Sequence, residues 1–136
     1  MYVGKLDGEG VLRCADGRVY TGQFVGGQCN GHIEMKCPEG VTAIKTATGE
    51  WREGRLHGRA KVEYHDGSLY DGDWVAGSRK GHGCSISQMD NMYVGAWSAG
   101  TYAGYGVYID SLRGSTYLGM WEDGNRQVCM QPDLAV

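Results

Sequence analysis

The chain has 136 residues, a formal net charge of −3 at pH 7 and an isoelectric point near 5.7. This charge gives no general case for nucleic-acid binding, no apolar run approaches a transmembrane span, and the N-terminus lacks the charged-then-apolar pattern of a signal peptide. The 24 glycines could indicate disorder or collagen, but the sequence has no triplet period and only two prolines.

The predicted elements are β-hairpins that begin at regular intervals. They are expected near residues 20–37, 47–64, 70–87, 93–110 and 117–131, followed by a tail at 132–136. Turn glycines recur about every dozen residues, and no long stretch has helical periodicity. A four-residue insertion in the segment CPEGVTAIKTATGE predicts a bulge between Gly40 and Ala47.

One hairpin, YDGDWVAGSRKGHG, illustrates the pattern. Tyr70 and Trp74 lie on alternate positions of one strand, so both rings share a face. Gly81 and Gly83 are expected to share a face of the returning strand, where missing side chains leave room for rings. The prediction is that Trp74 and Trp97 pack over these glycines and over their equivalents in the next hairpin, Gly104 and Gly106.

The same residues recur in columns along the chain. The first aromatic column holds Tyr20, Tyr70, Tyr93 and Tyr117, the second holds Phe24, Trp51, Trp74, Trp97 and Trp121, and the glycines of the returning arm include Gly58, Gly81, Gly83, Gly104 and Gly106. Such self-similarity is typical of repeats that bury surface by stacking on their neighbours. The predicted fold class is all-β: an elongated, twisted antiparallel β-meander of about five 23-residue hairpins in a single layer, roughly 50 Å long.

These columns resemble the MORN (membrane occupation and recognition nexus) repeat family, in which Y-x-G-x-W-x-x-G-x-x-x-G-x-G recurs. The resemblance runs from residue 4 to residue 124, in five registers, and the first residues look like the middle of a repeat. It implies one MORN-repeat domain over residues 1–136, acting as a non-catalytic scaffold or protein-interaction module with cytoskeletal, membrane or trafficking partners. Residues 104–121 are also similar to the repeat region of alsin-type exchange factors for small GTPases, which implies an alternative role as a regulatory module of a larger signalling protein.

The sequence offers no catalytic or metal-binding pattern. It contains no C-x-x-C or H-x-x-x-H spacing, Ser85 and Ser87 have no evident base, and His57 directly precedes a column glycine, as histidine often does in MORN repeats. We therefore expect no enzyme activity, no cofactor and no metal. Five cysteines without paired spacing favour a reducing compartment, and we expect the cytoplasm, with cytoskeletal or membrane association.

Another class of aromatic, glycine-rich hairpins is the cell-wall-binding repeat, which uses cages of aromatic rings for choline or glucan. Those repeats usually carry adjacent Trp/Tyr pairs and little cysteine. Here the aromatics are two positions apart, and there are five cysteines. Glycan binding is therefore the third-ranked hypothesis.

The residues between the columns should form the opposite face of the ribbon. In the early repeats they are polar or charged, whereas from the fourth repeat they become Cys84, Ile86, Val94, Ala96, Tyr105, Val107, Ile109, Leu118 and Met120. Contiguous apolar surface marks contacts. We expect a protein partner there, with a homodimer first and a helix of a cytoskeletal or trafficking protein second; coverage by the tail, from Val128 onward, is a further alternative.

Basic residues are concentrated in two neighbouring repeats of this acidic chain: Arg52, Arg55, Arg59, Lys61, Arg79 and Lys80. They predict either a site for anionic phospholipid or a solvated edge balanced by Glu50, Glu53 and Glu63.

Overall fold

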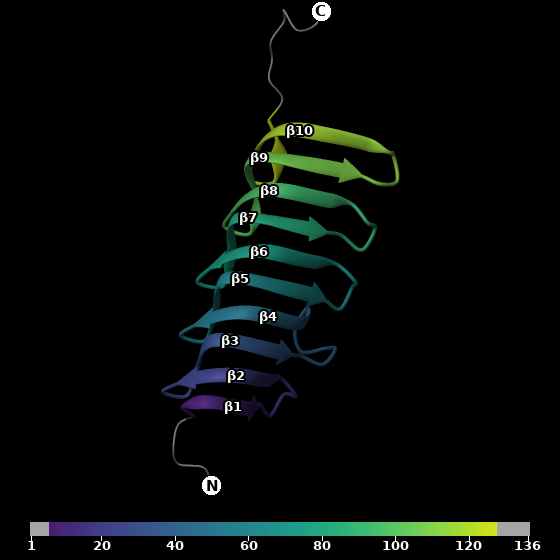
Figure 1. Ribbon diagram of the computed structural model, residues 1–136. Helices are drawn as coiled ribbons and strands as arrows, with labels where there is room; N and C mark the ends of the chain where they lie inside the picture. Colours follow the sequence, from purple (N-terminus) through teal and green to yellow (C-terminus); the bar gives the residue numbers. More distant parts are fainter. Residues whose placement is uncertain (1–5, 128–136) are drawn as a thin grey trace, which may run out of the picture.

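The chain forms eleven strands that follow one another as a meander in one antiparallel sheet (Figure 1). Side chains along each strand alternate between the two faces of the sheet. The computed structural model describes residues 6–127. The strands are β1 (Gly8–Arg13), β2 (Val19–Val25), β3 (Gln28–Lys36), β4 (Ile44–Arg52), β5 (Arg55–Tyr64), β6 (Leu69–Val75), β7 (Ser78–Ile86), β8 (Met92–Ser98), β9 (Thr101–Asp110), β10 (Ser115–Glu122) and β11 (Asn125–Arg126). Each strand pairs with its neighbours in the chain, and no described residue is helical. The predicted all-β meander is confirmed.

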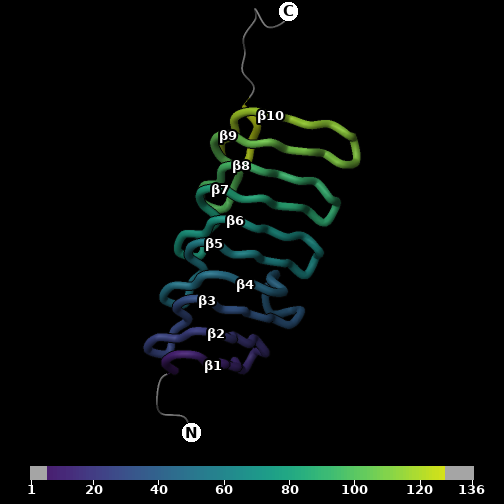
Figure 2. The backbone as a smooth tube through the Cα atoms, in the orientation of Figure 1, coloured from purple at the N-terminus to yellow at the C-terminus, as the bar shows by residue number. Residues whose placement is uncertain are grey.

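Two kinds of connection separate the strands, and they lie along opposite edges of the ribbon (Figure 2). The short turns each contain two residues with positive φ, as in Ala76 (49°) followed by Gly77 (85°). Both positive angles identify type I′ turns, whose twist matches that of the flanking strands. The turn then bonds to the preceding hairpin, because the Gly77 N–H donates to the Leu56 carbonyl at 2.9 Å. This bond repeats at the other short turns and ties each unit to the one before it.

Four hairpins have an irregularity in strand pairing just before their large ring, at Phe24, Trp51, Trp74 and Trp97. The pairing register shifts between Gly72 and Trp74, and again between Gly95 and Trp97. In the hairpin of Trp74, the His82 N–H donates to a carboxylate oxygen of Asp73 at 3.1 Å. A side chain from the polar face therefore satisfies a backbone donor beside the irregularity.

The core is a row of interlocking rings on one face of the sheet, which we call the inner face. Tyr70 and Tyr93 have 0% exposure, and each has edge-to-face contacts with tryptophans of its own hairpin and of the next. The centroid distances for Tyr70 are 5.3 Å to Trp74 and 5.0 Å to Trp97. Such T-shaped pairs add to the burial energy, so the rings hold consecutive repeats together.

The prediction that tryptophans cover the returning-arm glycines is partly wrong, because tyrosines do most of the covering. A Cβ on Gly83 would lie 2.2 Å from the Tyr70 hydroxyl oxygen, and a Cβ on Gly106 would meet the Tyr93 ring in the same way. Trp97 reaches Gly83 differently, since its indole N–H donates to the Gly83 carbonyl at 3.2 Å. The hydrogen-bonded tyrosine thus occupies the space, and the tryptophan contacts the backbone.

Gly81 and Gly83 also do not share a face as expected. Gly81 has a φ of 103°, and a Cβ there would lie 3.1 Å from the Cβ of Asp73, on the polar face. Gly58 and Gly104 behave likewise, with φ values of 108° and 65°. This column is therefore glycine because of its backbone angle, whereas Gly83 and Gly106 provide space for rings.

The insertion predicted to distort the ribbon lies in the connection between β3 and β4. Residues 37–43 form no strand, and the register of β4 shifts between Ile44 and Thr46. Pro38 of this connection packs against Gly17, where a Cβ would lie 2.8 Å from the proline ring. The longer connection is thereby packed against the preceding long turn. Val128, Met130 and the tail lie outside the described residues.

Candidate functional site

An uncharged patch covers the outer face of β8, β9 and β10, opposite the rings. Its most exposed members are Val94 (45%), Tyr105 (60%), Ile109 (36%), Leu118 (60%) and Met120 (52%). Cross-strand pairing brings them together, because Val94 and Leu118 both lie opposite Val107, and Tyr105 lies opposite Met120. We call these five residues the apolar patch.

The other four residues of the expected interface border the apolar patch and are partly buried: Cys84, Ile86, Ala96 and Val107. Cys84 pairs with Val94 and extends the uncharged surface to β7. Burial raises the pKa of the Cys84 thiol, and the nearby Asp71 adds to the rise, so the thiol stays neutral at pH 7. The register thus places all nine residues on one continuous side of β7 to β10.

The same face is charged over the preceding strands. Arg59 lies 3.5 Å from Asp71 and 4.0 Å from Asp73, and Lys61 lies 4.0 Å from Glu63. These pairs are exposed and contribute little to stability. The outer face therefore changes from a charged half to an apolar half at β7.

The six basic residues do not form one surface. Arg52 and Arg55 lie opposite each other in the strand register, next to the turn of the β4–β5 hairpin. Lys80 is exposed on β7. Arg59 and Lys61 lie on the outer face beside carboxylates. Arg79 points to the inner face, opposite Trp74. The expected cluster is therefore corrected, because Arg79 of β7 lies among the rings of the inner face, away from Arg59 and Lys61 on the outer face.

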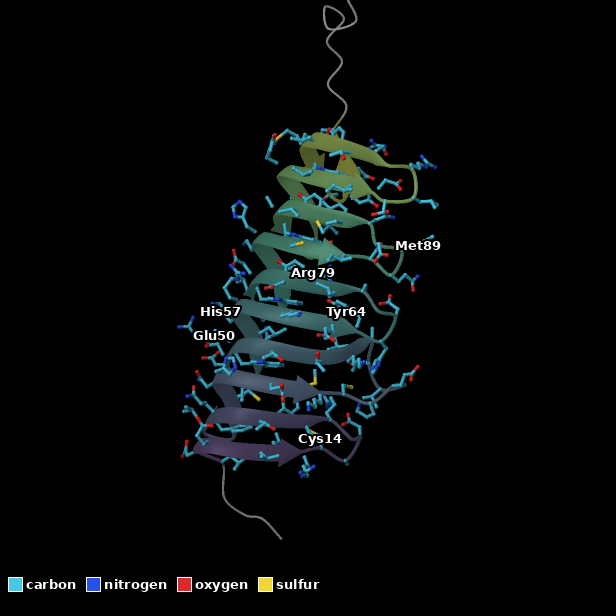
Figure 3. The ribbon with its side chains drawn as sticks, turned by 45° about the vertical axis from the view of Figure 1, so that its right-hand side comes forward. Cys14, Glu50, His57, Tyr64, Arg79 and Met89 are labelled. Carbon is cyan, nitrogen blue, oxygen red and sulfur yellow. The ribbon has the colours of Figure 1, made fainter. Side chains whose placement is uncertain are left out.

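Arg79 occupies a hollow in the inner face that sequence analysis did not identify. Its guanidinium carbon lies 5.3 Å from the ring centroid of Tyr64, 4.9 Å from that of Tyr70 and 5.1 Å from that of Trp97. The Arg79 guanidinium also donates to the Tyr64 hydroxyl. Figure 3 shows Arg79 and Tyr64 over the middle strands, away from His57 at the edge.

The hollow beside Arg79 has a volume of about 320 Å³, and we call it the Arg79 groove. Its lining includes rings, hydroxyls and one guanidinium: Tyr64, Ser68, Arg79, Ser85, Trp97 and Tyr102. Ile86, counted in the expected outer interface, also borders it. The column that contains Arg79 could have been found from the sequence, because its members stand two residues after each turn glycine: Leu6, Cys29, Leu56, Arg79, Tyr102 and Arg126.

The repeats match the family model described as "MORN repeat" at residues 4–17, 20–40, 48–69, 70–92 and 93–111. The chain belongs to the MORN-repeat family. It is also similar to alsin from rat (36% identical over 126 residues) and to alsin from human (35% over 126 residues). Each alignment covers 88% of this chain but 8% of the relative, so the chain spans a small part of those proteins.

The MORN-repeat family is a family of non-catalytic repeat modules. Within residues 6–127 there is no group of three or more metal-ligating side chains. His57 has a structural contact, because its Nδ1 accepts a hydrogen bond of 3.3 Å from the Ala76 N–H in the next turn. The same residues include no helix that could span a bilayer.

The four tryptophans of these MORN repeats do not form open cages for glycans. Trp51, Trp74, Trp97 and Trp121 are at most 8% exposed, and their faces and edges contact neighbouring rings. A carbohydrate needs an exposed ring to stack on. The hypothesis of aromatic-cage glycan binding therefore loses its structural basis at these four positions.

Alkaline pH is expected to loosen the MORN ring stack through Tyr70. Burial raises the pKa of Tyr70 from 10.0 to about 12, so the folded state favours the neutral phenol. The stabilising effect is complete below pH 10 and is lost as the pH rises toward 12, by about 2 kcal/mol in total. Urea titrations from pH 9 to pH 12 should show this fall.

Tyr70→Phe is the control, since phenylalanine does not titrate. It should be less stable at pH 9 by about 1 kcal/mol, because the Tyr70 hydroxyl donates to the Asp73 carbonyl at 3.0 Å. Its free energy of unfolding should then fall less steeply above pH 10. Equal slopes for both proteins would contradict the assignment to Tyr70.

Proposed function

We propose that this chain is a non-catalytic MORN-repeat interaction module that self-associates through the apolar patch. The observation that carries the proposal is the contrast within the outer face, which is charged over β5 and β6 and uncharged over β8 to β10. Five large apolar side chains lie together on one side of three adjacent strands. Contiguous apolar surface of this kind marks an interaction site, whereas single exposed apolar residues are normal on a protein surface. The proposed location is the cytoplasm, which suits the free thiols Cys14, Cys29, Cys37 and Cys84.

A second copy is the favoured occupant because a two-fold axis brings one patch against itself. A specific dimer buries about 800 Å² on each partner. The contact would therefore extend from the apolar patch to its border at Cys84, Ile86, Ala96 and Val107. The charged half of the outer face would lie outside the contact, where its ion pairs stay solvated.

The test is the mass of the protein in solution. Light scattering or sedimentation equilibrium of the full chain should give twice the 14.8 kDa of one copy at micromolar concentration. Val94→Asp combined with Leu118→Asp should give a folded monomer, because both side chains are exposed and neither touches the rings. The fold is checked by far-ultraviolet circular dichroism and by melting temperature.

A matched control places two aspartates on exposed valines elsewhere. Val11→Asp combined with Val25→Asp makes the same change in net charge at residues that are 48% and 59% exposed on β1 and β2. This variant should remain a dimer. A wild-type monomer at high micromolar concentration would contradict the proposal, as would a helix of another protein binding the patch more tightly than a second copy does.

A second candidate function is favoured by the similarity to alsin over most of the chain. Here the repeats would be the regulatory module of a larger signalling protein that resembles an exchange factor. Sequencing the full transcript tests this, since it should continue the reading frame into an exchange domain. A reading frame made of MORN repeats alone would contradict it.

A further inference from the structure

Arg79 is the one charged residue among the column positions on β3, β5, β7 and β9, whereas the last described member, Arg126, is exposed and lies over Tyr117 at 5.1 Å. The equivalent positions in the preceding hairpins are Cys29 and Leu56, both 5% exposed and part of the core, and the next position is Tyr102. A partly buried guanidinium at such a position has a desolvation cost that a leucine would not have. The surrounding rings offset part of that cost through cation–π contacts, and they leave its charge unneutralised.

No carboxylate within residues 6–127 forms an ion pair with Arg79; Asp66, which lines an adjoining hollow with Arg79, instead accepts hydrogen bonds from Ser68. Six ion pairs are formed within residues 6–127, and none includes Arg79. Its one side-chain hydrogen bond goes to Tyr64, although a guanidinium has five N–H donors. The adjoining hollow near β10 differs, because it contains Asp110, which pairs with Arg113 at 3.9 Å.

The Arg79 groove has the size and lining to receive a side chain from outside. The groove has a volume of about 320 Å³ and is lined by residues of β7, β8 and β9 together with Tyr64 and Ser68. Arg79 is the one charged residue in its lining. Ser68, Ser85 and Thr101 supply hydroxyls, and the rings of Tyr64, Trp97 and Tyr102 supply apolar walls. The groove thus pairs a single positive charge with hydrogen-bonding groups and aromatic carbon.

We propose that the Arg79 groove is a recognition site for an acidic side chain, aspartate or glutamate, presented by a partner peptide with apolar residues beside it. The carboxylate binds the free N–H groups of Arg79, and the flanking apolar groups contact the rings. A planar guanidinium suits a carboxylate because two parallel hydrogen bonds can form. One cation matches one carboxylate, whereas a phosphorylated lipid headgroup carries several charges that this lining does not balance.

Arg79 lies on the face opposite the apolar patch, and of the proposed dimer contact only Ile86 also lines the groove, so the test measures binding at Arg79 separately from self-association. Random heptapeptides displayed on phage are selected on the full chain, and the best binder is synthesised with its acidic residue intact or changed to the amide. Selected peptides should be enriched in Asp or Glu next to apolar residues. Arg79→Leu, which copies Leu56 of the column, should weaken binding of the acidic peptide tenfold or more, and the amide peptide should bind wild type equally weakly.

Two further variants separate specific recognition from a change in net charge. Arg79→Lys keeps the charge without the planar fork and should bind with intermediate affinity. Arg59→Leu removes a charge from the outer face, where Arg59 is 73% exposed, and should bind as wild type does. The Trp97 indole N–H signal in an NMR spectrum should shift with the acidic peptide and not with the amide.

Three results would overturn the proposal. The first is a selection that yields no acidic peptides, and the second is equal affinity of wild type and Arg79→Leu for the acidic peptide. The third is Arg79-dependent pelleting with phosphatidylserine vesicles in the absence of peptide binding, which would assign the groove to a membrane surface.

Discussion

Gly83→Val is expected to lower the free energy of unfolding by about 3 kcal/mol or more, at the upper end of the range for overpacking. The three atoms nearest to a Cβ at Gly83 are the hydroxyl oxygen and two ring carbons of Tyr70, at 2.2 to 2.6 Å. Tyr70 cannot move aside easily, because it is fully buried, lies edge-to-face with Trp74 and Trp97, and donates to the Asp73 carbonyl. Urea denaturation at pH 7 measures the loss.

Two controls connect this loss to the tyrosine. Gly10→Ala should cost much less, because the nearest contact of its Cβ is the flexible end of Leu6, at 3.1 Å. In a Tyr70→Ala background, Gly83→Ala should cost less than it does in wild type, since the obstructing ring is gone. A melting temperature for Gly83→Val within a degree of wild type, or simple additivity in the double variant, would show that Tyr70 does not fill this space.

Tyr93→Ala is expected to lower the free energy of unfolding by about 3–5 kcal/mol, the usual cost of removing a buried aromatic side chain. Tyr93 stacks on Tyr102 at 4.0 Å with an interplanar angle of 9°, and lies edge-to-face with Trp97 and Trp121. Its removal would leave a cavity above Gly106 that no other side chain fills. Urea denaturation at pH 7 again measures the loss.

Tyr93→Phe serves as the graded control because it keeps the ring. It loses one hydrogen bond, from the Tyr93 hydroxyl to the Ala96 carbonyl at 2.8 Å, and should cost about 1 kcal/mol. Equal losses for the alanine and phenylalanine variants would show that the hydroxyl, and not ring stacking, dominates at this position.

The fold class could be predicted from the sequence because the MORN repeat has rings and glycines at fixed, short spacings along the chain. Alternation of Tyr70, Gly72 and Trp74 defines a strand face, and the turn glycines set the length of each hairpin. A five-fold repetition makes each such signal stronger than it would be alone. The change of the outer face from charged to apolar was visible for the same reason, since side chains alternate strictly between the two faces.

What the sequence by itself determined is therefore the meander, its repeat length and the faces of most strand residues, although it assigned Gly81 to the wrong face. Only the tertiary structure decided which ring covers which glycine, because the shift between Gly72 and Trp74 changes how neighbouring strands align. It alone also showed that Arg79 lies among three rings from three strands while Arg59 lies on the opposite face. The spacing of residues along one strand indicates which face of the sheet each side chain lies on. Contacts between repeats also depend on strand register and on bends in the strands, which are properties of the assembled sheet.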